Sequence, residues 1–332
     1  MIERVKNMLA GKKVLFIACK FYHYGDAIHE KFRSYGADVT FYYERDTSLK
    51  HVVMSNFFPD KMQAWQDRHY QKILQETEGK RFDYLIVIRG FRMENWFVDT
   101  IRKRNPGIYT ILYQWDSYKA WESDFRHLLP SFDKTLTFDY DDCKTLALPY
   151  APTFYTDEYA GIKNGPYEFD FIYCTNLSLE KYEFMIKFLA YASQRGYRVR
   201  THLYISWLGY VLNRMKGYDI DYQHVSFRRL SRKEYFKLFC KSKTIVDFSG
   251  TSQTGITMRI IDALGSGKRV ITNNVHVTKE PGYDPRQVVV YNANDIDLPD
   301  DITQEESFSK KDYSIDKWMD NLFFKTLEPA FA

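Results

Sequence analysis

Polar residues suited to holding a phosphate surround one glycine-bearing loop in the C-terminal half of the chain. Ser249-Gly250 ends the short apolar run Thr244–Phe248, and a helical pattern begins at Thr257. A strand that enters a helix through such a loop leaves backbone N–H groups at the positive end of the helix, where a phosphate can bind. Asp262 lies about two turns into that helix, at a distance suited to a ribose hydroxyl. The same loop and helix supply three further candidate contacts to a nucleotide: Thr254, Gly255 and Arg259.

Two other segments offer contacts to the same ligand. Phe227–Lys233 is the densest basic run, and the guanidinium pair Arg228 and Arg229 suits a diphosphate whose charge grows as a sugar bond breaks. Asn176 follows another apolar run. Ordinary structural roles explain these features equally well. The basic run can be a solvated loop and helix start, and the glycine loop a turn in a βαβ unit with a solvated Asp262.

Acid–base candidates come from the N-terminal half. Asp116 follows an apolar run beside Trp115, and burial in a cleft would raise the pKa of its carboxyl and favour a role as general base. The alternative is that Asp116 is a helix N-cap. Asp26 and His23 follow the first apolar run, where Asp26 is either a base or an N-cap. Residues expected to face an acceptor at the ends of these strands are Tyr24, Gly25, Arg89, Gly90 and Trp115.

Metal-binding patterns in the sequence are weak. His23 and His29 are six residues apart and lack a third ligand. Asp219-Ile220-Asp221 follows a helix end, and Asp295-Ile296-Asp297 lies in a polar loop, so neither is placed like a metal-binding Asp-x-Asp after a strand. The four scattered cysteines indicate reduced thiols. We therefore expect no cofactor and no metal requirement, because cationic side chains and a helix dipole can neutralise a diphosphate.

Strand and helix patterns alternate through both halves of the chain. Apolar runs predict strands at 13–19, 37–43, 84–88, 109–113 and 134–138, and again at 170–174, 199–205, 244–248, 270–272 and 288–291. Prolines and glycines between Pro149 and Pro166 interrupt the pattern. The alternation predicts an α/β protein with two doubly wound, Rossmann-like domains facing a central cleft, residues 1–155 and 156–332. Ser314–Phe324 is expected to form a docking helix at the end of the second domain.

The composition is that of a globular protein with a mild positive charge. Of the 332 residues, 45% are hydrophobic and 27% charged, which favours two ordered cores. Aromatic residues make up 17%, so many are expected at surfaces or clefts. The net charge of +4 suits an anionic donor or a lipid-phosphate surface but is too weak to indicate nucleic acid. Without a signal-peptide pattern or a run of transmembrane length, the expected location is the cytoplasm, with at most a peripheral membrane contact.

One run in the sequence carries a family resemblance: Arg259-x-x-Asp262-Ala263-Leu264-Gly265-x-Gly267-x-x-Val270-Ile271. It resembles the donor-binding signature of group 1 glycosyltransferases of the GT-B type, especially the CgeB-like subgroup of spore and surface-polysaccharide clusters. Many group 1 enzymes have two glutamates in this region, whereas this chain has Thr254 and Asp262. Asp262 can still accept from a ribose diol, but Thr254 cannot replace a carboxylate, so retaining chemistry is left open. Gly265 and Gly267 are expected to end the helix.

The resemblance implies a GT-B-like glycosyltransferase. Such an enzyme would move a sugar from a nucleotide-diphosphate donor on the second domain to a glycan or lipid-linked acceptor on the first. The setting would be cell-surface polysaccharide, capsule or lipopolysaccharide assembly at the inner membrane face. GT-B enzymes usually place an Arg/Lys pair after the first strand of the second domain; here Asn176–Glu183 contains only Lys181. Arg228, Arg229, Arg259 or the helix N-terminus would then hold the diphosphate. The alternatives are a sugar-nucleotide epimerase and a non-catalytic nucleotide- or sugar-binding module.

Overall fold

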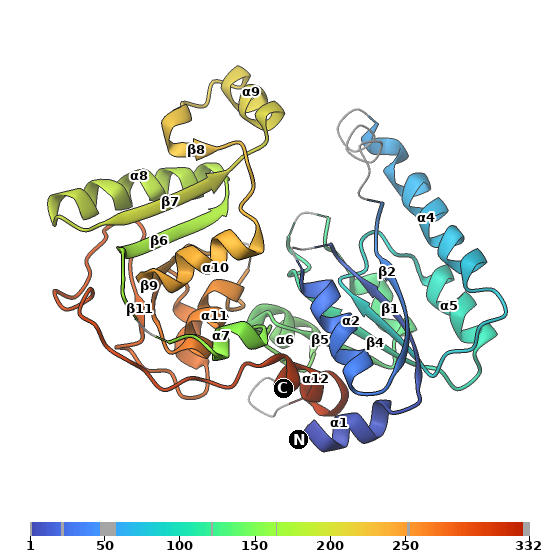
Figure 1. The fold of residues 1–332 in the computed structure, drawn as a ribbon. Helices are drawn as coiled ribbons and strands as arrows, with labels where there is room; N and C mark the ends of the chain where they lie inside the picture. The colour runs from blue at the N-terminus through green and yellow to red at the C-terminus, as the bar shows by residue number, and fades with distance from the viewer. Residues whose placement is uncertain are drawn as a thin grey trace. The chain divides into compact units, whose positions relative to one another are not determined.

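The chain folds into two compact units (Figure 1). The computed structural model describes residues 2–20, 23–46, 58–120, 122–163, 165–250 and 253–327. The first unit comprises the chain up to Thr153 together with the C-terminal segment from Ile315, and the second is Phe154–Ser314. Among the described residues, no helix combines the length and the apolar character needed to cross a membrane.

The first unit is a five-stranded parallel sheet in the order β2-β1-β3-β4-β5. Its strands are β1 (Lys13–Ala18), β2 (Asp38–Tyr43), β3 (Tyr84–Ile88), β4 (Tyr109–Gln114) and β5 (Lys134–Thr137). Its described helices are α1 (Ile2–Leu9), α2 (Tyr24–Ser34), η1 (Pro59–Lys61), α4 (Met62–Glu76), α5 (Asn95–Arg104), η2 (Arg126–Ser131), α6 (Tyr140–Leu146) and α12 (Ile315–Phe324). The central strands β1, β3 and β4 are buried, largely apolar runs because helices cover both faces of a parallel sheet.

The C-terminal helix α12 belongs to this first unit. Trp318 is buried, with its ring 5.1 Å from that of Tyr113 on β4 in an edge-to-face arrangement. Arg4 of α1 donates two hydrogen bonds of 2.5 Å to the carboxylate of Asp320. We predicted this helix within the range 156–332, and the family resemblance implies that the last helices cross back to the first domain. The chain does return to the first unit after Ser314, where the apolar stripe of α12 is buried.

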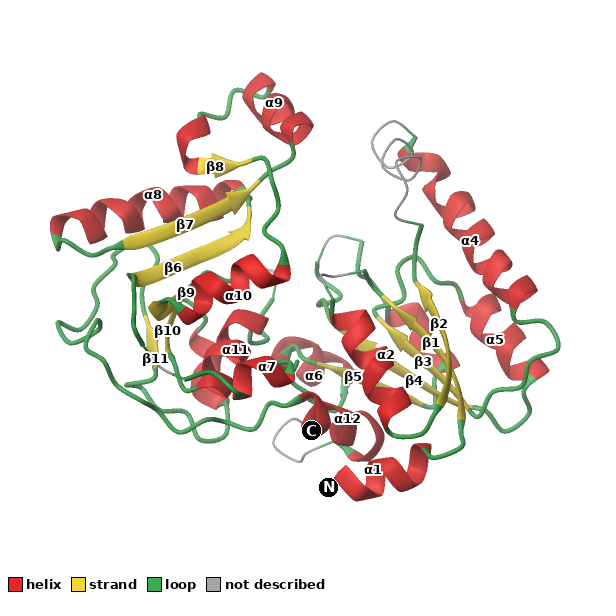
Figure 2. Ribbon diagram, in the orientation of Figure 1, coloured by secondary structure: helices red, strands yellow, loops and turns green. Residues whose placement is uncertain are grey.

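The second unit is a six-stranded parallel sheet in the order β11-β10-β9-β6-β7-β8. Its strands are β6 (Phe169–Asn176), β7 (Val199–Tyr204), β8 (Val225–Ser226), β9 (Ser242–Asp247), β10 (Arg269–Thr272) and β11 (Val288–Val290). Its described helices are α7 (Asp157–Ala160), α8 (Leu179–Gln194), α9 (Trp207–Met215), η3 (Tyr222–His224), α10 (Arg232–Cys240), α11 (Met258–Ser266) and η4 (Val275–Lys279). In Figure 2, α8 lies along one face of this sheet, and α10 and α11 lie along the other.

Alternate residues of β6 pack into two different cores. Phe171 and Tyr173 join Phe188 of α8, whereas Ile172 joins Phe239 of α10 and Ile260 of α11. This division follows from the two-residue period of a strand, which sends successive side chains to opposite faces. The prediction of two doubly wound parallel sheets is confirmed.

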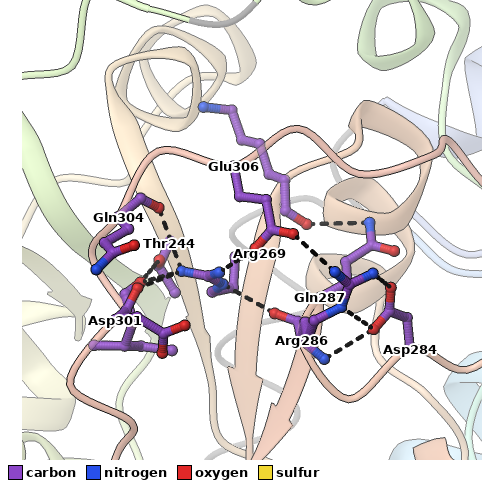
Figure 3. Close-up of polar contacts among 10 residues, drawn as sticks. Thr244, Arg269, Asp284, Arg286, Gln287, Asp301, Gln304 and Glu306 are labelled. Atoms are coloured by element: carbon purple, nitrogen blue, oxygen red, sulfur yellow. Dashed lines mark hydrogen bonds and ion pairs between the residues drawn. The ribbon is translucent and has the colours of Figure 1, made fainter.

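A buried arginine links the amino end of β10 to neighbouring segments by hydrogen bonds. Arg269 donates from Nε to the Arg286 carbonyl at 2.9 Å and from Nη1 to the carbonyls of Asp301 and Ile302 at 2.9 and 2.8 Å. Its Nη2 donates to the Glu306 carboxylate at 2.8 Å. Figure 3 shows the guanidinium between these groups, which come from the approaches to β11 and from the segment before α12. Because the contacts lie at the amino edge of the sheet, we assign them a structural role.

The helix α11 ends differently from the expectation. Gly267 has a left-handed φ of 73° and is the C-cap, as the prediction required. Gly265 instead lies inside the helix, where an added Cβ would come within 2.1 Å of the Tyr155 ring. Gly265 is therefore required for close packing of α11 and not for ending it.

Candidate functional site

The strand order fixes where each sheet can hold a ligand. In the first sheet, β2 and β3 lie on opposite sides of β1. In the second, the chain runs outward from β6 to β8, then returns to the other side of β6 and runs outward from β9 to β11. Connections diverge at these switch points, and ligands of open parallel sheets bind there, outside the carboxyl ends of the strands.

Asp247 is the centre of the second switch point. It ends β9, is fully buried, and accepts hydrogen bonds from side chains of three consecutive elements. The donors among the described residues are Thr257 at 2.7 Å, Thr272 at 2.8 Å, Arg259 at 2.8 and 2.9 Å and Ser249 at 3.1 Å. A buried carboxylate is stable only when it is paired and hydrogen-bonded. Asp247 therefore joins the ends of β9 and β10 to the start of α11.

Arg259 pairs directly with this carboxylate, and Lys181 lies near enough for the charge of Asp247 to act on it. Burial disfavours the charged guanidinium of Arg259, but Asp247 more than offsets this effect and raises the pKa of Arg259. Lys181 lies in the first turn of α8, and burial lowers its pKa. The charge of Arg259 lowers the pKa of Lys181 further, while Asp247 opposes the shift. An anion bound at this edge would relieve the repulsion between the two cations.

The loops after β6 and β9 adjoin at the same edge. A Cβ on Gly250 would lie 3.8 Å from Oε2 of Glu180, in the first turn of α8. Ser249 donates its N–H to Asn273 Oδ1 at 2.7 Å and accepts from Asn273 Nδ2 at 3.0 Å. The predicted residues Ser249 and Gly250 therefore lie at the switch point. Asn176 is the exposed last residue of β6.

The approach to α11 is fixed by Asn274. Its Nδ2 donates to the carbonyls of Thr254 and Gly255 at 3.1 and 3.0 Å. Thr257 is the N-cap of α11, and its hydroxyl donates to Asp247. Four predicted donor residues, Thr254, Gly255, Thr257 and Arg259, therefore lie on one segment around the N-terminus of α11.

Asp262 is in a different environment from the one expected. Its side chain is only 2% exposed, on a helix that is also covered by α7. Burial raises the pKa of Asp262 well above its ordinary range, partly opposed by a hydrogen bond with Tyr159 and by the charge of Arg259. Its Oδ1 has no hydrogen-bond partner in the described part of the chain. This burial argues against a ribose contact, and the ribose role stays a prediction.

Arg228 and Arg229 lie beyond the carboxyl ends of β7 and β8, away from the Asp247 contacts. The Arg228 carbonyl accepts from His202 of β7, and its guanidinium pairs with Glu234 at 2.8 Å. The Arg229 guanidinium lies 4.7 Å from the centre of the Tyr204 ring. Their role in holding a diphosphate also stays a prediction.

The first switch point has an arginine between two carboxylates. Arg89 follows β3, and its Nε lies 3.1 Å from Asp116 Oδ2, while its Nη1 lies 3.6 Å from Glu44 Oε1. Glu44 follows β2, is fully buried and accepts the Phe91 N–H at 2.8 Å. Burial raises the pKa of Glu44, and Arg89 opposes this shift. The structure thus brings the predicted residues Arg89 and Asp116 together and adds Glu44.

The backbone after β3 is strained at this point. Arg89 has a φ of 70° and Gly90 a φ of 76°. Only glycine adopts such angles without cost, and a residue with a side chain loses about 1–3 kcal/mol. The Arg89 carbonyl accepts from Gln114 Nε2 at 3.0 Å, which helps to hold the conformation. The turn aims the Arg89 side chain between the two carboxylates.

Aromatic residues stand beside this cluster. The His23 ring stacks on Tyr24 at 4.7 Å, and Tyr24 meets the edge of Trp115 at 5.7 Å. Gly25 is buried, and an added Cβ would lie 3.4 Å from the Cys19 carbonyl. The predicted acceptor-side residues after β1 and β4 therefore adjoin one another.

Both N-cap alternatives are wrong. Residues 117–120 form turns and bends and not a helix after Asp116. Helix α2 begins at Tyr24 with His23 at the N-cap position, so Asp26 lies in the first turn. There Asp26 accepts from the Tyr43 hydroxyl at 2.8 Å. Burial, followed by this carboxylate, raises the pKa of Tyr43 to about 12.

Asp247 and Glu44 were missed as site residues. Both follow the rule that singled out Asp116: an acidic residue closes an apolar run, in Thr244-Ile245-Val246-Asp247 and in Phe41-Tyr42-Tyr43-Glu44.

The described residues include no group of three or more His, Cys, Asp or Glu arranged to hold a metal ion. Asp219 pairs with Arg214 at 2.7 Å, and Asp221 is the N-cap of η3.

Comparisons with known proteins give a fold and not a family. No protein-family model matches the sequence, and no curated protein matches it. The OtsA apo structure matches with a TM-score of 0.51 and 9% identity, over 81% of this chain and 86% of that one. The S. aureus MnaA–UDP co-structure has a TM-score of 0.48 and 10% identity, over 85% and 84%. The lipopolysaccharide outer core galactosyltransferase WaaB, in its apo form, has a TM-score of 0.43 and 15% identity, over 78% and 80%.

At these identities the likeness concerns architecture. Together with the two all-parallel sheets, the match to OtsA shows a two-domain, Rossmann-like GT-B fold. The fold class expected from the sequence is thereby confirmed.

Proposed function

We propose that the chain is a glycosyltransferase that holds a nucleotide-diphosphate sugar on its second unit. The observation that carries the proposal is the Arg259–Asp247 ion pair at the N-terminus of α11, with Lys181 of α8 near enough for both charges to act on it, at the switch point between β6 and β9. A diphosphate leaving group gains negative charge as the glycosidic bond of the donor breaks, and fixed cations stabilise that charge. The N-terminus of α11, capped by Thr257, adds partial positive charge at the same edge.

The two cations have different roles in this proposal. Arg259 is already paired with Asp247 at 2.8 Å, so it contributes position more than free charge. Lys181 is less compensated, because burial and Arg259 both disfavour its ammonium group. Lys181 therefore gains most from a bound diphosphate, and metal ions are not required. Arg228 and Arg229 would contact the donor only at the outer edge of its site.

The first unit supplies the acceptor side. Asp116, oriented by Arg89, is the general base or an essential sugar contact, and Asp26 and His23 are the next candidates. The run from Arg259 to Ile271 supports a closer relation to group 1, CgeB-like enzymes. That relation would make the acceptor a glycan or a lipid-linked sugar of a surface polysaccharide or lipopolysaccharide, assembled from the cytoplasmic side.

Turnover of a donor panel tests the proposal. The purified chain is incubated with UDP-, GDP-, dTDP- and CMP-sugars, and nucleotide release and sugar identity are followed. Release of a nucleoside diphosphate with sugar transfer supports a transferase. An altered sugar on an intact nucleotide would indicate an epimerase, and binding without either product would indicate a binding module. Activity that is lost with EDTA and restored by Mn²⁺ would contradict metal-independent transfer.

A further inference from the structure

A short helix of the second unit presents apolar side chains to solvent. No described residue of α9 is buried, and Trp207 and Met215 are 64% and 79% exposed. We define the α9 surface by its exposed large apolar residues on this helix and the following segment: Trp207, Leu208, Leu212, Met215, Tyr218, Tyr222 and Phe227. Exposed apolar side chains that gather on one surface often mark an interaction site.

The apolar residues of α9 form one face. Positions 207, 208, 211, 212 and 215 are Trp, Leu, Val, Leu and Met, with the spacing of a single amphipathic stripe. Tyr210 is partly buried, stacks on the Trp207 ring at 5.9 Å and anchors the helix, because its hydroxyl donates to the Ile220 carbonyl at 3.2 Å. In Figure 1, α9 stands beyond the edge strand β8 of the sheet. The stripe is therefore not needed to complete the core of this unit.

The segment that follows α9 extends the surface. The Phe227 ring meets Trp207 at 4.9 Å and Tyr210 at 5.3 Å, both edge to face. Phe227 immediately precedes Arg228 and Arg229, so the aromatic cluster adjoins cationic side chains. Aromatic residues next to basic residues are typical of protein segments that bind at a membrane interface.

The positive charge of the chain is concentrated here. Residues 207–233 contain six Lys and Arg but two Asp and Glu, whereas the whole chain contains 47 and 43. This segment thus accounts for the entire net charge of +4, and the rest of the chain has equal numbers of basic and acidic residues. Lys216, Arg229 and Lys233 form no ion pair within the part of the chain that the structure describes.

We propose that the α9 surface docks the second unit on an anionic lipid bilayer. Apolar side chains of α9 would enter the headgroup region while the neighbouring cations contact lipid phosphates. A second copy of the chain is a poorer occupant, because a two-fold contact would bring the same positive segments together. The inference does not depend on glycosyl transfer.

Vesicle co-sedimentation of the full chain tests this docking. Vesicles of phosphatidylcholine alone are compared with vesicles that contain about 30% phosphatidylglycerol, whose negative charge should attract the basic segment. We expect sedimentation with the anionic vesicles and little with the neutral ones. Leu208→Glu together with Met215→Glu should weaken binding by about tenfold or more, because two apolar anchors are lost and two negative charges are added. Met215→Glu alone, at the exposed end of α9, should give a smaller loss.

The matched control is Val275→Glu, which places the same charge on an exposed apolar residue of η4 (60% exposed). It should bind like the wild type. Equal binding to both vesicle types, binding to neither, or full binding by both α9 variants would overturn the proposal. A dimer seen by light scattering without vesicles, and dissociated by Met215→Glu, would assign the surface to a second copy and would overturn it as well.

Discussion

The carboxyl edges of the two sheets use the same kinds of residue in opposite proportions. At the first edge, Arg89 is shared by Asp116 and Glu44. At the second, Asp247 pairs with Arg259, and its charge also acts on Lys181. Arg45 also acts on Glu44, and Glu180 also acts on Lys181. The direct ion pairs thus centre on a cation at the first edge and on a carboxylate at the second.

We propose that this difference separates the roles of the two units, which have similar topology. An anionic diphosphate is attracted by the second edge and repelled by carboxylates at the first. A carboxylate held by an arginine suits contact with, or deprotonation of, a sugar hydroxyl. The architecture alone would not separate donor from acceptor, because both sheets have a switch point where a ligand can bind.

The largest effect is expected at the first edge. Asp116→Asn keeps the shape of the side chain but removes its charge, so kcat should fall by about two to four decades with donor affinity nearly intact. Turnover and donor affinity are measured for the same preparation. Asp124→Asn is the matched control, because Asp124 forms an exposed pair with Arg126 at 2.6 Å elsewhere in this unit. A fully active Asp116→Asn enzyme would move the search for the base to Asp26 and His23.

A large loss of stability is expected at the second edge. Asp247→Asn leaves Arg259 buried without its counter-charge, which costs about 3–5 kcal/mol when a buried pair is broken. Equilibrium urea denaturation measures the change. Asp284→Asn removes an exposed pair with Arg286 and should be almost silent. Equal, small effects of both substitutions would show that Asp247 is not the centre of the site.

Asp142 holds the segment that follows Asp116, and its contribution to stability should depend on pH. It is buried and accepts hydrogen bonds from the Ser117 hydroxyl at 2.8 Å and from the Tyr118 N–H at 3.1 Å, the two residues directly after Asp116. Burial, and to a lesser degree the neighbouring Asp139, raise the pKa of Asp142 to about 6. The unfolded value is about 3.9, so between these values the folded chain binds more protons than the unfolded one.

The stability contribution of Asp142 should therefore fall as the pH rises from about 4 to about 6, and then level off. Asp142→Asn removes this titration. Melting temperatures of the wild type and the variant, measured at steps across that range, should diverge as the pH rises, with the variant becoming relatively more stable. Parallel curves would contradict the assignment.

The smallest effect is expected at Asp262. Because burial raises the pKa of Asp262 and disfavours its charged form, Asp262→Asn should change melting temperature and nucleotide affinity little. The ribose hypothesis predicts instead a loss of about 1.5–3 kcal/mol in binding for each hydrogen bond to a charged acceptor. Calorimetry with a free nucleoside diphosphate distinguishes the two, and a loss of that size would restore Asp262 to the donor site.

The architecture followed directly from the sequence. The strand predicted at 84–88 is β3 with the same bounds, and the other runs differ from the observed strands by a few residues. Continuous apolar segments bounded by Gly and Pro identify buried parallel strands because both faces are covered. The docking helix was also found, but its apolar stripe does not say which unit it covers.

The sequence predicted which strand ends form the site, but not which side chains meet there. The partners of Asp247 come from residues 249, 257, 259 and 272, which only the sheet order brings together. Arg89 reaches Asp116 from the neighbouring strand, so a capping motif was expected where an ion pair exists. Asp262 was predicted to contact a ribose, with a solvated position as the alternative, whereas it is buried on a helix that α7 covers. Local spacing locates strand ends, but it does not determine which side chains meet there.

A calorimetric titration of nucleoside diphosphates tests the central claim most directly. The wild type, Lys181→Met and the control Lys187→Met are titrated with UDP, GDP and dTDP; Lys187 is an exposed lysine on the same helix. We expect at least one nucleotide to bind the wild type and the control equally. Lys181→Met should bind it about tenfold or more weakly, because a hydrogen bond to a charged group contributes about 1.5–3 kcal/mol. Equal affinity in all three proteins, or no nucleotide binding by the wild type, would contradict a donor site at the second edge.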